Sequence, residues 1–177
     1  VSVVIPTLNA MAYLPALLPA LRSQKPCPPM EILIVDSRST DGTRNFVQQA
    51  GGGDVRLIDV TRFSHGGTRN LGIQNARGPI VVFLSQDAIP RDDTWLAELI
   101  APLQDPQVAA SFSRQVPRSD ANPMEQFFLA THFPENPVVY RRRPDGQPPA
   151  FQRDVFFSNV SSADRKKKKD VEDYIPH

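Results

Sequence analysis

The chain has 177 residues, 40% hydrophobic and 22% charged, a composition typical of a globular protein with a real core and not of a disordered one. Its 20 basic and 19 acidic side chains give a net charge of +1, which argues against a general nucleic-acid-binding protein. No apolar run approaches the roughly 18 residues of a membrane span, and we expect no secretory signal at the amino terminus.

Apolar strand patterns alternate with helical patterns through the first half of the chain. Apolar or largely apolar runs predict strands at residues 1–5, 32–35, 55–60, 80–84 and 108–112. Apolar spacing and capping residues predict helices at 13–21, 41–50, 68–76 and 94–103. Asn9 is the expected cap of the first helix, and Pro19 is expected to kink or shorten it. Asp92 or Asp93 is the expected cap of the fourth.

The pattern weakens after Arg114, because seven prolines between Pro117 and Pro149 interrupt helix interiors and central strands. Here we expect one helix at 123–131 and one strand at 154–157. Repeated strand–helix units with wholly apolar strands predict an α/β fold, in which helices cover both faces of a mainly parallel sheet. The carboxy-terminal part is expected to be rich in loops.

Short polar segments follow four of the predicted strands, at residues 7–9, 36–38, 64–67 and 85–87. Ligands of such sheets bind beyond the carboxyl ends of the strands, so these segments are the expected binding site. The chain has neither a Gly-x-Gly-x-x-Gly fingerprint nor a Walker A sequence, so other groups must hold any nucleotide.

Three side chains in these segments, together with Arg69 in the first turn of the helix predicted at 68–76, each fit a ligand role and a structural role. Asp36 suits hydrogen bonds to a base or ribose, or a turn cap. Asp87 suits Mg²⁺ or Mn²⁺ completed by substrate phosphates, or an Asx turn. Arg69 suits phosphate oxygens or a surface ion pair, and His65 suits a phosphate or sugar or a satisfied place in a loop.

Four segments together resemble glycosyltransferase family 2, which has the GT-A fold. Residues 1–9 (VSVVIPTLN) resemble its opening strand and Pro-Thr-x-Asn turn, and residues 34–43 (IVDSRSTDGT) resemble its second strand end. Residues 65–80 are similar to its Ala-Arg-Asn-x-Gly region, and residues 82–90 (VFLSQDAIP) stand where its Asp-x-Asp motif lies. The forms His-Gly-Gly-Thr-Arg-Asn and Gln-Asp-Ala-Ile-Pro most resemble the rhamnosyltransferase branch.

The resemblance implies inverting transfer of a sugar from a nucleotide diphosphate donor. It implies a nucleotide-sugar-binding set made of Pro6, Thr7, Asn9, Asp36, Arg69, Gln86 and Asp87. Within this set Asp36 would bind the base, and Asp87 would hold Mg²⁺ or Mn²⁺ on the diphosphate. The first Asp of Asp-x-Asp is Ser85 in this chain, so metal binding would depend on Asp87 with waters.

The likeness is good over residues 1–115, the expected nucleotide-sugar-binding half, and loose over residues 116–177, an acceptor-side part that we expect to be incomplete. The family's catalytic base lies in a later Glu-Asp segment. The pair Glu172–Asp173 is the candidate in this chain, which makes Asp173 the possible base; the competing interpretation is a solvated surface pair.

The sequence therefore predicts a glycosyltransferase, plausibly of rhamnose from dTDP-rhamnose to a polysaccharide or lipid-linked acceptor. We expect it in the cytoplasm, with peripheral contact to the inner face of the plasma membrane through Arg141–Arg143, and no nucleic-acid partner. The alternatives are a non-catalytic nucleotide-sugar-binding module and a sugar-nucleotide nucleotidyltransferase. The latter needs a glycine-rich loop after the first strand, which residues 6–9 do not offer.

Overall fold

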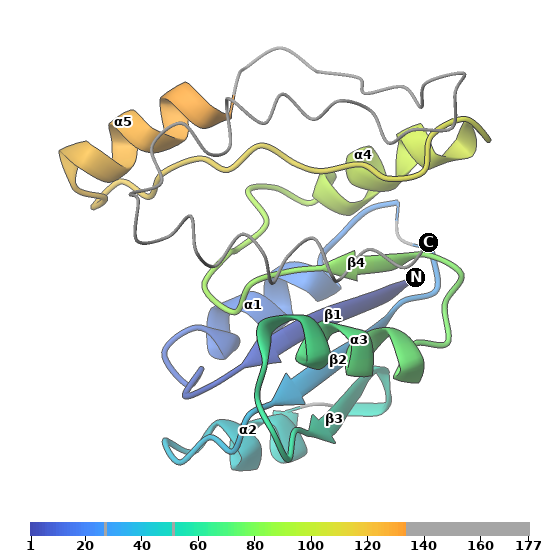
Figure 1. Ribbon diagram of the computed structural model, residues 1–177, viewed down its shortest axis with the longest axis vertical. Coiled ribbons are helices and arrows are strands. Elements are labelled where there is room, and N and C mark those ends of the chain that lie inside the picture. The colour runs from blue at the N-terminus through green and yellow to red at the C-terminus, as the bar shows by residue number, and fades with distance from the viewer. Residues whose placement is uncertain (27, 51, 134–177) are drawn as a thin grey trace. The chain divides into compact units, whose positions relative to one another are not determined.

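The computed structural model describes residues 1–26, 28–50 and 52–133 (Figure 1). By its contacts the chain divides between Glu98 and Leu99 into two units, which are described separately below. The sequence predicts a different, functional boundary near residue 115, between a donor-binding part and an acceptor-side part. That boundary stays a prediction.

The first unit contains a four-stranded parallel sheet, which confirms the predicted α/β class. Its strands are β1 (Ser2–Thr7), β2 (Glu31–Asp36), β3 (Val55–Asp59) and β4 (Val81–Phe83), in the order β3-β2-β1-β4. Thr7 pairs with Asp36 and Asp36 with Asp59, so these three strands end level with one another. The strand order reverses between β1 and β4, which is where sheets of this kind bind ligands.

Helices join the strands and cover the sheet. Helix α1 (Leu14–Arg22) follows β1, α2 (Thr43–Ala50) follows β2, and α3 (His65–Asn75) returns the chain from β3 to β4. Right-handed crossovers place α1 and α2 on one face and α3 on the other. Figure 1 shows α3 in front of β1 and β2, with α1 behind the sheet.

Alternate residues of the central strands build two apolar layers. Val4, Leu33, Val35 and Val60 form a buried cluster against which Leu71 of α3 packs. The four buried leucines of α1 belong to the other layer. Because both faces are covered, β2 is buried from Ile32 to Asp36, as its unbroken apolar run predicts.

The capping of the first helix is a correction to the sequence prediction. Tyr13, and not Asn9, precedes α1, and no side chain caps the helix. Pro15 occupies the first turn as expected, and Pro19 lies inside a helix that ends at Arg22. Asn9 instead has a left-handed φ of 52° and takes part in the loop contacts described below.

The fourth predicted helix is shorter than expected. Helix α4 covers Trp95–Ile100 and gives way to a 3-10 turn at Ala101–Gln104, because Pro102 has no N–H to continue an α-helix. Of the two candidate caps, Asp92 accepts a hydrogen bond from the Thr94 N–H at 3.1 Å.

The second unit confirms one predicted element and corrects another. Helix α5 (Pro123–His132) matches the prediction, and Asn122 caps it by accepting from the Glu125 N–H at 2.9 Å. The predicted fifth strand at 108–112 was wrong: this stretch has no strand pairing, and Phe112 is 62% exposed. An apolar run forms a strand only where a neighbouring strand satisfies its backbone groups. The strand predicted at 154–157 lies outside the described residues.

Every helix of the described residues is too short or too polar to cross a lipid bilayer.

Glu31 is the first residue of β2, and its ionisation is expected to make the stability of the fold depend on pH. Burial raises the pKa of Glu31, but hydrogen bonds from the Ser2 hydroxyl, the Arg77 N–H and the Arg56 guanidinium outweigh it and leave the pKa below its usual value. A lowered folded pKa means that this stabilisation is present above the unfolded pKa and is lost as the pH falls through the folded one.

We therefore expect Glu31→Gln to reduce the free energy of unfolding by about 1–2 kcal/mol at pH 7, the size of hydrogen bonds to a charged group. The two proteins should become similar near pH 3. Urea titrations at both pH values measure this difference. A deficit that is the same at both pH values would contradict the assignment.

Candidate functional site

The loop after β1 is fastened to the loop after β2 by hydrogen bonds between side chains and backbone. The N–H groups of Asn9, Ala10 and Met11 donate to Ser39 Oγ, Thr43 Oγ1 and Asp41 Oδ2 at 2.8, 2.8 and 2.9 Å. In return Asn9 Oδ1 accepts from the Thr40 N–H at 2.9 Å. The polar residues that follow β2 thus hold the loop after β1 in shape. This role explains much of the serine, threonine and aspartate content of the loop after β2.

Asp41 is the centre of this connection. Burial raises its pKa, but hydrogen bonds from the Thr43 hydroxyl and from the backbone N–H groups of Met11 and Thr43 outweigh it, so the pKa lies below its usual value. The carboxylate therefore stays ionised and also begins α2. The next residue, Gly42, has a φ of +95°, which favours glycine.

Asp36 lies at the end of β2 and is fully buried. Its carboxylate accepts hydrogen bonds from Thr7 Oγ1 at 3.0 Å, from the Ser39 N–H at 3.0 Å and from Ser39 Oγ at 2.5 Å. Arg44 completes the set with an ion pair at 3.2 Å and also contacts Asp59. Four donors around one buried carboxylate hold the ends of β1 and β2 together.

Helix α3 begins at the rim of the sheet and lies close to β1. Ser64 caps it, its hydroxyl accepting from the Gly67 N–H at 3.0 Å. About two turns further on, a Cβ added to Gly72 would lie 2.3 Å from Val4 Cγ1, so the absence of a side chain sets the spacing between helix and strand. This contact positions the first turn of α3, which carries His65, Thr68 and Arg69.

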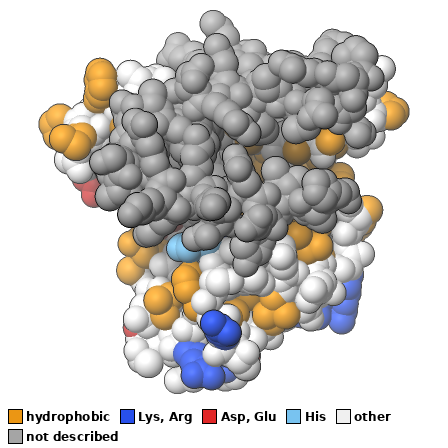
Figure 2. Space-filling view, in the orientation of Figure 1, with side chains coloured by type: hydrophobic (Ala, Val, Ile, Leu, Met, Phe, Trp, Pro, Cys, Tyr) orange, Lys and Arg blue, Asp and Glu red, His pale blue; other side chains and the backbone are white. Residues whose placement is uncertain are grey.

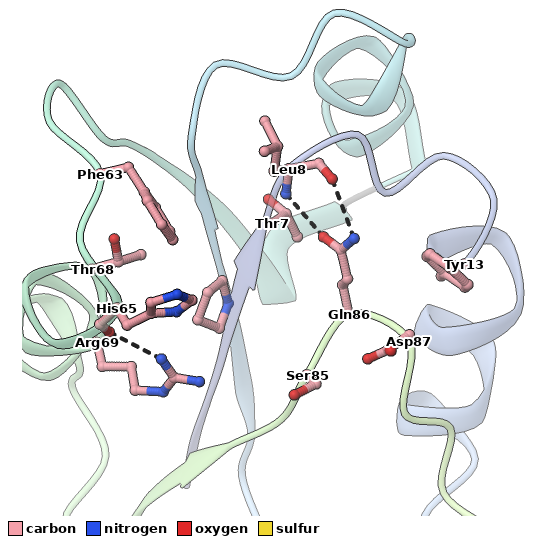
Figure 3. Close-up of a pocket in the computed structure, with 11 residues that line it drawn as sticks. Thr7, Leu8, Tyr13, Phe63, His65, Thr68, Arg69, Ser85, Gln86 and Asp87 are labelled. Carbon is pink, nitrogen blue, oxygen red and sulfur yellow. Dashed lines mark hydrogen bonds between the residues drawn. The ribbon is translucent and has the colours of Figure 1, made fainter. Parts of the chain in front are cut away.

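The loop after β4 is joined to the loop after β1 by one side chain. Gln86 Oε1 accepts from the Leu8 N–H at 2.9 Å, and its Nε2 donates to the Leu8 carbonyl at 3.2 Å (Figure 3). The amide thus pairs with the backbone as another strand would. This places the neighbouring Ser85 and Asp87 beside the end of β1.

These loops and the start of α3 enclose a pocket of about 320 Å³ within the first unit. Its walls come from the ends of β1 and β4, from α3 and from the start of α1 (Figure 3). The lining residues are Pro6, Thr7, Leu8, Tyr13, Phe63, His65, Thr68, Arg69, Ser85, Gln86 and Asp87.

The pocket brings together five of the residues expected from sequence to bind a nucleotide sugar. They are Pro6, Thr7, Arg69, Gln86 and Asp87. Two others, Asn9 and Asp36, do not line it: Asn9 is in the loop-to-loop contact, and Asp36 is buried beneath Thr7 and Ser39. The candidate base Asp173 lies outside the described residues.

Three lining residues were missed as site candidates, namely Tyr13, Phe63 and Thr68. Tyr13 and Thr68 matched helical patterns, and a helical pattern does not say which face meets a pocket. Phe63 carried a usable signal, since it is a large aromatic residue in the polar stretch 61–67. Such a residue in a polar loop is a candidate ligand contact.

The donor atoms of the pocket fit a hard divalent cation shared with a ligand. Asp87 supplies a carboxylate and Ser85 a hydroxyl, whereas Gln86 already bonds Leu8 through its amide oxygen. No group of three or more His, Cys, Asp or Glu side chains that could hold a metal by itself occurs among the described residues. One carboxylate suits Mg²⁺ or Mn²⁺, which keep waters and take phosphate oxygens as further ligands.

Arg69 lies on the opposite side of the pocket from Asp87 (Figure 3). Its NH1 donates to the His65 carbonyl one turn earlier in α3 at 2.9 Å, which directs the guanidinium along the helix start. The remaining N–H groups of a guanidinium can still bind phosphate oxygens. The site therefore offers an acidic side and a basic side at the carboxyl rim of the sheet.

Comparison with known families matches residues 2–158 to the model described as "Glycosyl transferase family 2". Among curated proteins, the chain is 35% identical over 125 residues to the O-antigen chain rhamnosyltransferase RfbN of Salmonella typhimurium. This alignment covers 70% of this chain and 40% of that protein. It is 41% identical over 97 residues to WbaN of Salmonella anatum, also an O-antigen chain rhamnosyltransferase, covering 54% of this chain and 30% of that protein. The chain thus spans well under two thirds of these relatives.

Two solved structures share the fold. The mannosyltransferase PcManGT of Pyrobaculum calidifontis, in complex with GDP-Man and Mn²⁺, superposes with a TM-score of 0.56 at 31% identity, covering 60% of this chain and 33% of that chain. TarS 1-349 of S. aureus in complex with UDP-GlcNAc gives 0.52 at 27% identity, covering 67% and 37%. These likenesses agree with a GT-A arrangement of the sheet and helices.

Proposed function

Because the chain belongs to glycosyl transferase family 2, we propose that it is the donor-binding part of an inverting glycosyltransferase. The pocket at the end of β1 would hold a nucleotide diphosphate sugar. An acceptor hydroxyl then attacks the anomeric carbon while the bond from that carbon to the diphosphate breaks, so that the nucleoside diphosphate leaves, and a carboxylate takes the proton of the hydroxyl. The candidate for that base, Asp173, stays a prediction.

The observation that carries this proposal is the composition of the pocket. Polar groups from the loops after β1 and β4 and from α3 meet at the point where the strand order reverses. Asp87 and Arg69 lie on opposite sides of it, as a cation-bound diphosphate requires. The buried contacts of Asp36 and the hydrogen bonds between Gln86 and Leu8 join these loops to one another.

The names of the relatives support a choice of donor sugar and acceptor. Both Salmonella proteins are named O-antigen chain rhamnosyltransferases, so we take rhamnose from dTDP-rhamnose as the donor. A growing polysaccharide or lipid-linked glycan is the corresponding acceptor. That chemistry places the enzyme in the cytoplasm at the inner face of the plasma membrane, in peripheral contact with anionic lipid.

Asp87, with Ser85 beside it, is the residue that would hold Mg²⁺ or Mn²⁺. When bound, such an ion offsets the charge that develops on the leaving diphosphate. Arg69 supports the same phosphates from α3, and Thr7 and Leu8 form the floor between the two sides.

Isothermal titration calorimetry of the 177-residue chain with dTDP, UDP and GDP, each with and without Mn²⁺, tests the proposal. We expect one diphosphate to bind and its binding to require the metal. A chain that binds none of the three in either condition would contradict the proposed function. Binding without sugar transfer to any glycan acceptor would favour a non-catalytic module.

Asp87→Asn should weaken metal-dependent diphosphate binding by about 1–3 kcal/mol, because it removes the charge of a carboxylate that would contact the ion. Asp105→Asn in the second unit is the matched control and should bind as the unaltered chain does. The same titrations measure both variants. Equal affinity of Asp87→Asn and the unaltered chain would remove Asp87 from the metal site.

A further inference from the structure

The wall of the pocket on the α3 side contains an aromatic pair, Phe63 and His65. The rings of Phe63 and His65 meet edge to face, with centroids 5.0 Å apart and an interplanar angle of 74°. Figure 3 shows both beside Thr68, on the side of the pocket away from Asp87 and Tyr13. From this arrangement we propose that Phe63 is a donor-recognition residue whose ring packs against the planar base of the bound nucleotide.

The exposure of Phe63 is the first observation in favour. This side chain lines the pocket and yet is 53% exposed. It therefore contributes little to the core of the unit, and its apolar surface is available to a ligand. Figure 2 shows hydrophobic, basic and polar side chains intermixed on the viewed face of the described residues. A flat heteroaromatic base has a π-face that stacks on such a ring.

The position of the ring is set by its neighbours in sequence. Ser64, which caps α3 through the Gly67 N–H, stands between Phe63 and His65 and fixes the turn that carries both. The edge-to-face contact with His65 adds a preferred aromatic geometry. A ring oriented before the ligand arrives loses little conformational freedom on binding, which favours recognition.

A buried hydroxyl in the same wall is a second, independent observation. Thr68 is 1% exposed and lines the pocket, and its Oγ1 has no hydrogen-bond partner among the described residues. An unpaired buried hydroxyl is unfavourable unless something else pairs with it. The edge of a base or a ribose hydroxyl is polar and would offer Thr68 Oγ1 a hydrogen-bond partner next to the aromatic pair.

The charges of the pocket decide which part of a nucleotide lies here. The carboxylate of Asp87 and the guanidinium of Arg69 lie on opposite sides of the pocket, so the cation and the diphosphate belong between them. The wall made by Phe63, His65 and Thr68 contains no carboxylate and suits the nucleoside. This inference rests on the proposed function, because it assigns a residue within the same donor site.

The test compares Phe63→Leu with Phe127→Leu, the same substitution at a ring of α5 that is 72% exposed and does not line the pocket. Calorimetry with Mn²⁺ uses two probes, dTDP and inorganic pyrophosphate, which has no base. We expect Phe63→Leu to bind dTDP roughly tenfold more weakly and pyrophosphate as before. Phe127→Leu should match the unaltered chain for both probes, and Phe63→Tyr, which keeps the ring, should bind dTDP nearly normally.

The outcomes separate this inference from the proposed function. If the unaltered chain binds no nucleoside diphosphate, both are overturned. If it binds dTDP and Phe63→Leu binds equally well, or loses dTDP and pyrophosphate to the same degree, the role of Phe63 alone is overturned. A loss of dTDP affinity in Tyr13→Leu without one in Phe63→Leu would move the base to the opposite wall and overturn it as well.

Discussion

Asp36→Ala is expected to lower the free energy of unfolding by about 3–5 kcal/mol, as removal of one partner from a buried ion pair does. The side chain is fully buried, and its loss leaves the Thr7 hydroxyl and the Ser39 N–H without their acceptor and removes one of the two carboxylates that Arg44 contacts. Urea unfolding followed by circular dichroism measures the change.

Asp59→Ala is the matched control for this prediction, because Asp59 contacts the same arginine, Arg44, from the surface. The hydrogen bond from Arg44 lowers the pKa of Asp59, but its side chain is 64% exposed, and exposed pairs contribute about 1 kcal/mol or less. If the two variants lose equal stability, the buried network around Asp36 is not what holds β1 to β2.

The result also bears on how Asp36 would serve the donor site. The resemblance to glycosyltransferases implies a contact between this residue and the base, whereas its four protein partners give it a structural role. Asp36→Asn keeps the shape of the side chain and replaces one acceptor oxygen by a donor. We expect most of the stability loss to persist in this variant, because an amide N–H then faces the donors of Ser39 or Thr7.

Gly72→Ala is expected to cost about 3 kcal/mol of unfolding free energy, near the upper end of the usual range for overpacking. The new methyl group would lie 2.3 Å from Val4 Cγ1, in the cluster formed with Leu33 and Val35. Alanine is favoured over glycine inside a helix by up to about 1 kcal/mol. Gly72→Ala therefore destabilises the fold only if the packing clash costs more than this gain in helix propensity. Thermal unfolding measures the change.

Gly53→Ala is the control, because a Cβ at that residue meets nothing within 4 Å. It should be neutral or slightly stabilising. The double variant Val4→Ala with Gly72→Ala should lose less unfolding free energy than the sum of the two single variants, because the two residues contact each other and their effects couple. A double variant that only adds the two losses would show that the clash at Val4 is not the cause. Because α3 carries Thr68 and Arg69, a displaced helix should also weaken donor binding.

The first four strands could be predicted from their apolar or largely apolar runs, and a strand covered on both faces, such as β2, needs apolar residues at every position. The runs at 32–35 and 80–84 have that pattern, and the structure confirms strands at Glu31–Asp36 and Val81–Phe83. The run at 108–112 is also largely apolar but forms no strand. Composition can favour a strand, whereas backbone pairing with a neighbour makes one.

Helix boundaries followed local chemistry where that chemistry was unambiguous. Asn122 and the proline after it predict the start of α5, whereas α3 begins at His65 after its cap Ser64, three residues before the start predicted at residue 68. The start of α1 could not be predicted in this way, because the capping capacity of Asn9 is used by the Thr40 N–H from another loop. Asn9 therefore does not cap the helix that follows it and instead contacts a residue 31 positions away in sequence.

The amino-acid sequence by itself determined the α/β class, the family and the rim of the sheet that carries the site, because apolar strands and the polar segments after them are local patterns. Tertiary structure alone decided which of those polar residues face the pocket. It assigned Asp36 and Asn9 to loop contacts, Gln86 to both a loop contact and the lining, and Phe63 and Thr68 to the wall. The physical reason is that side-chain exposure depends on partners brought together by folding, and those partners lie far apart in the chain.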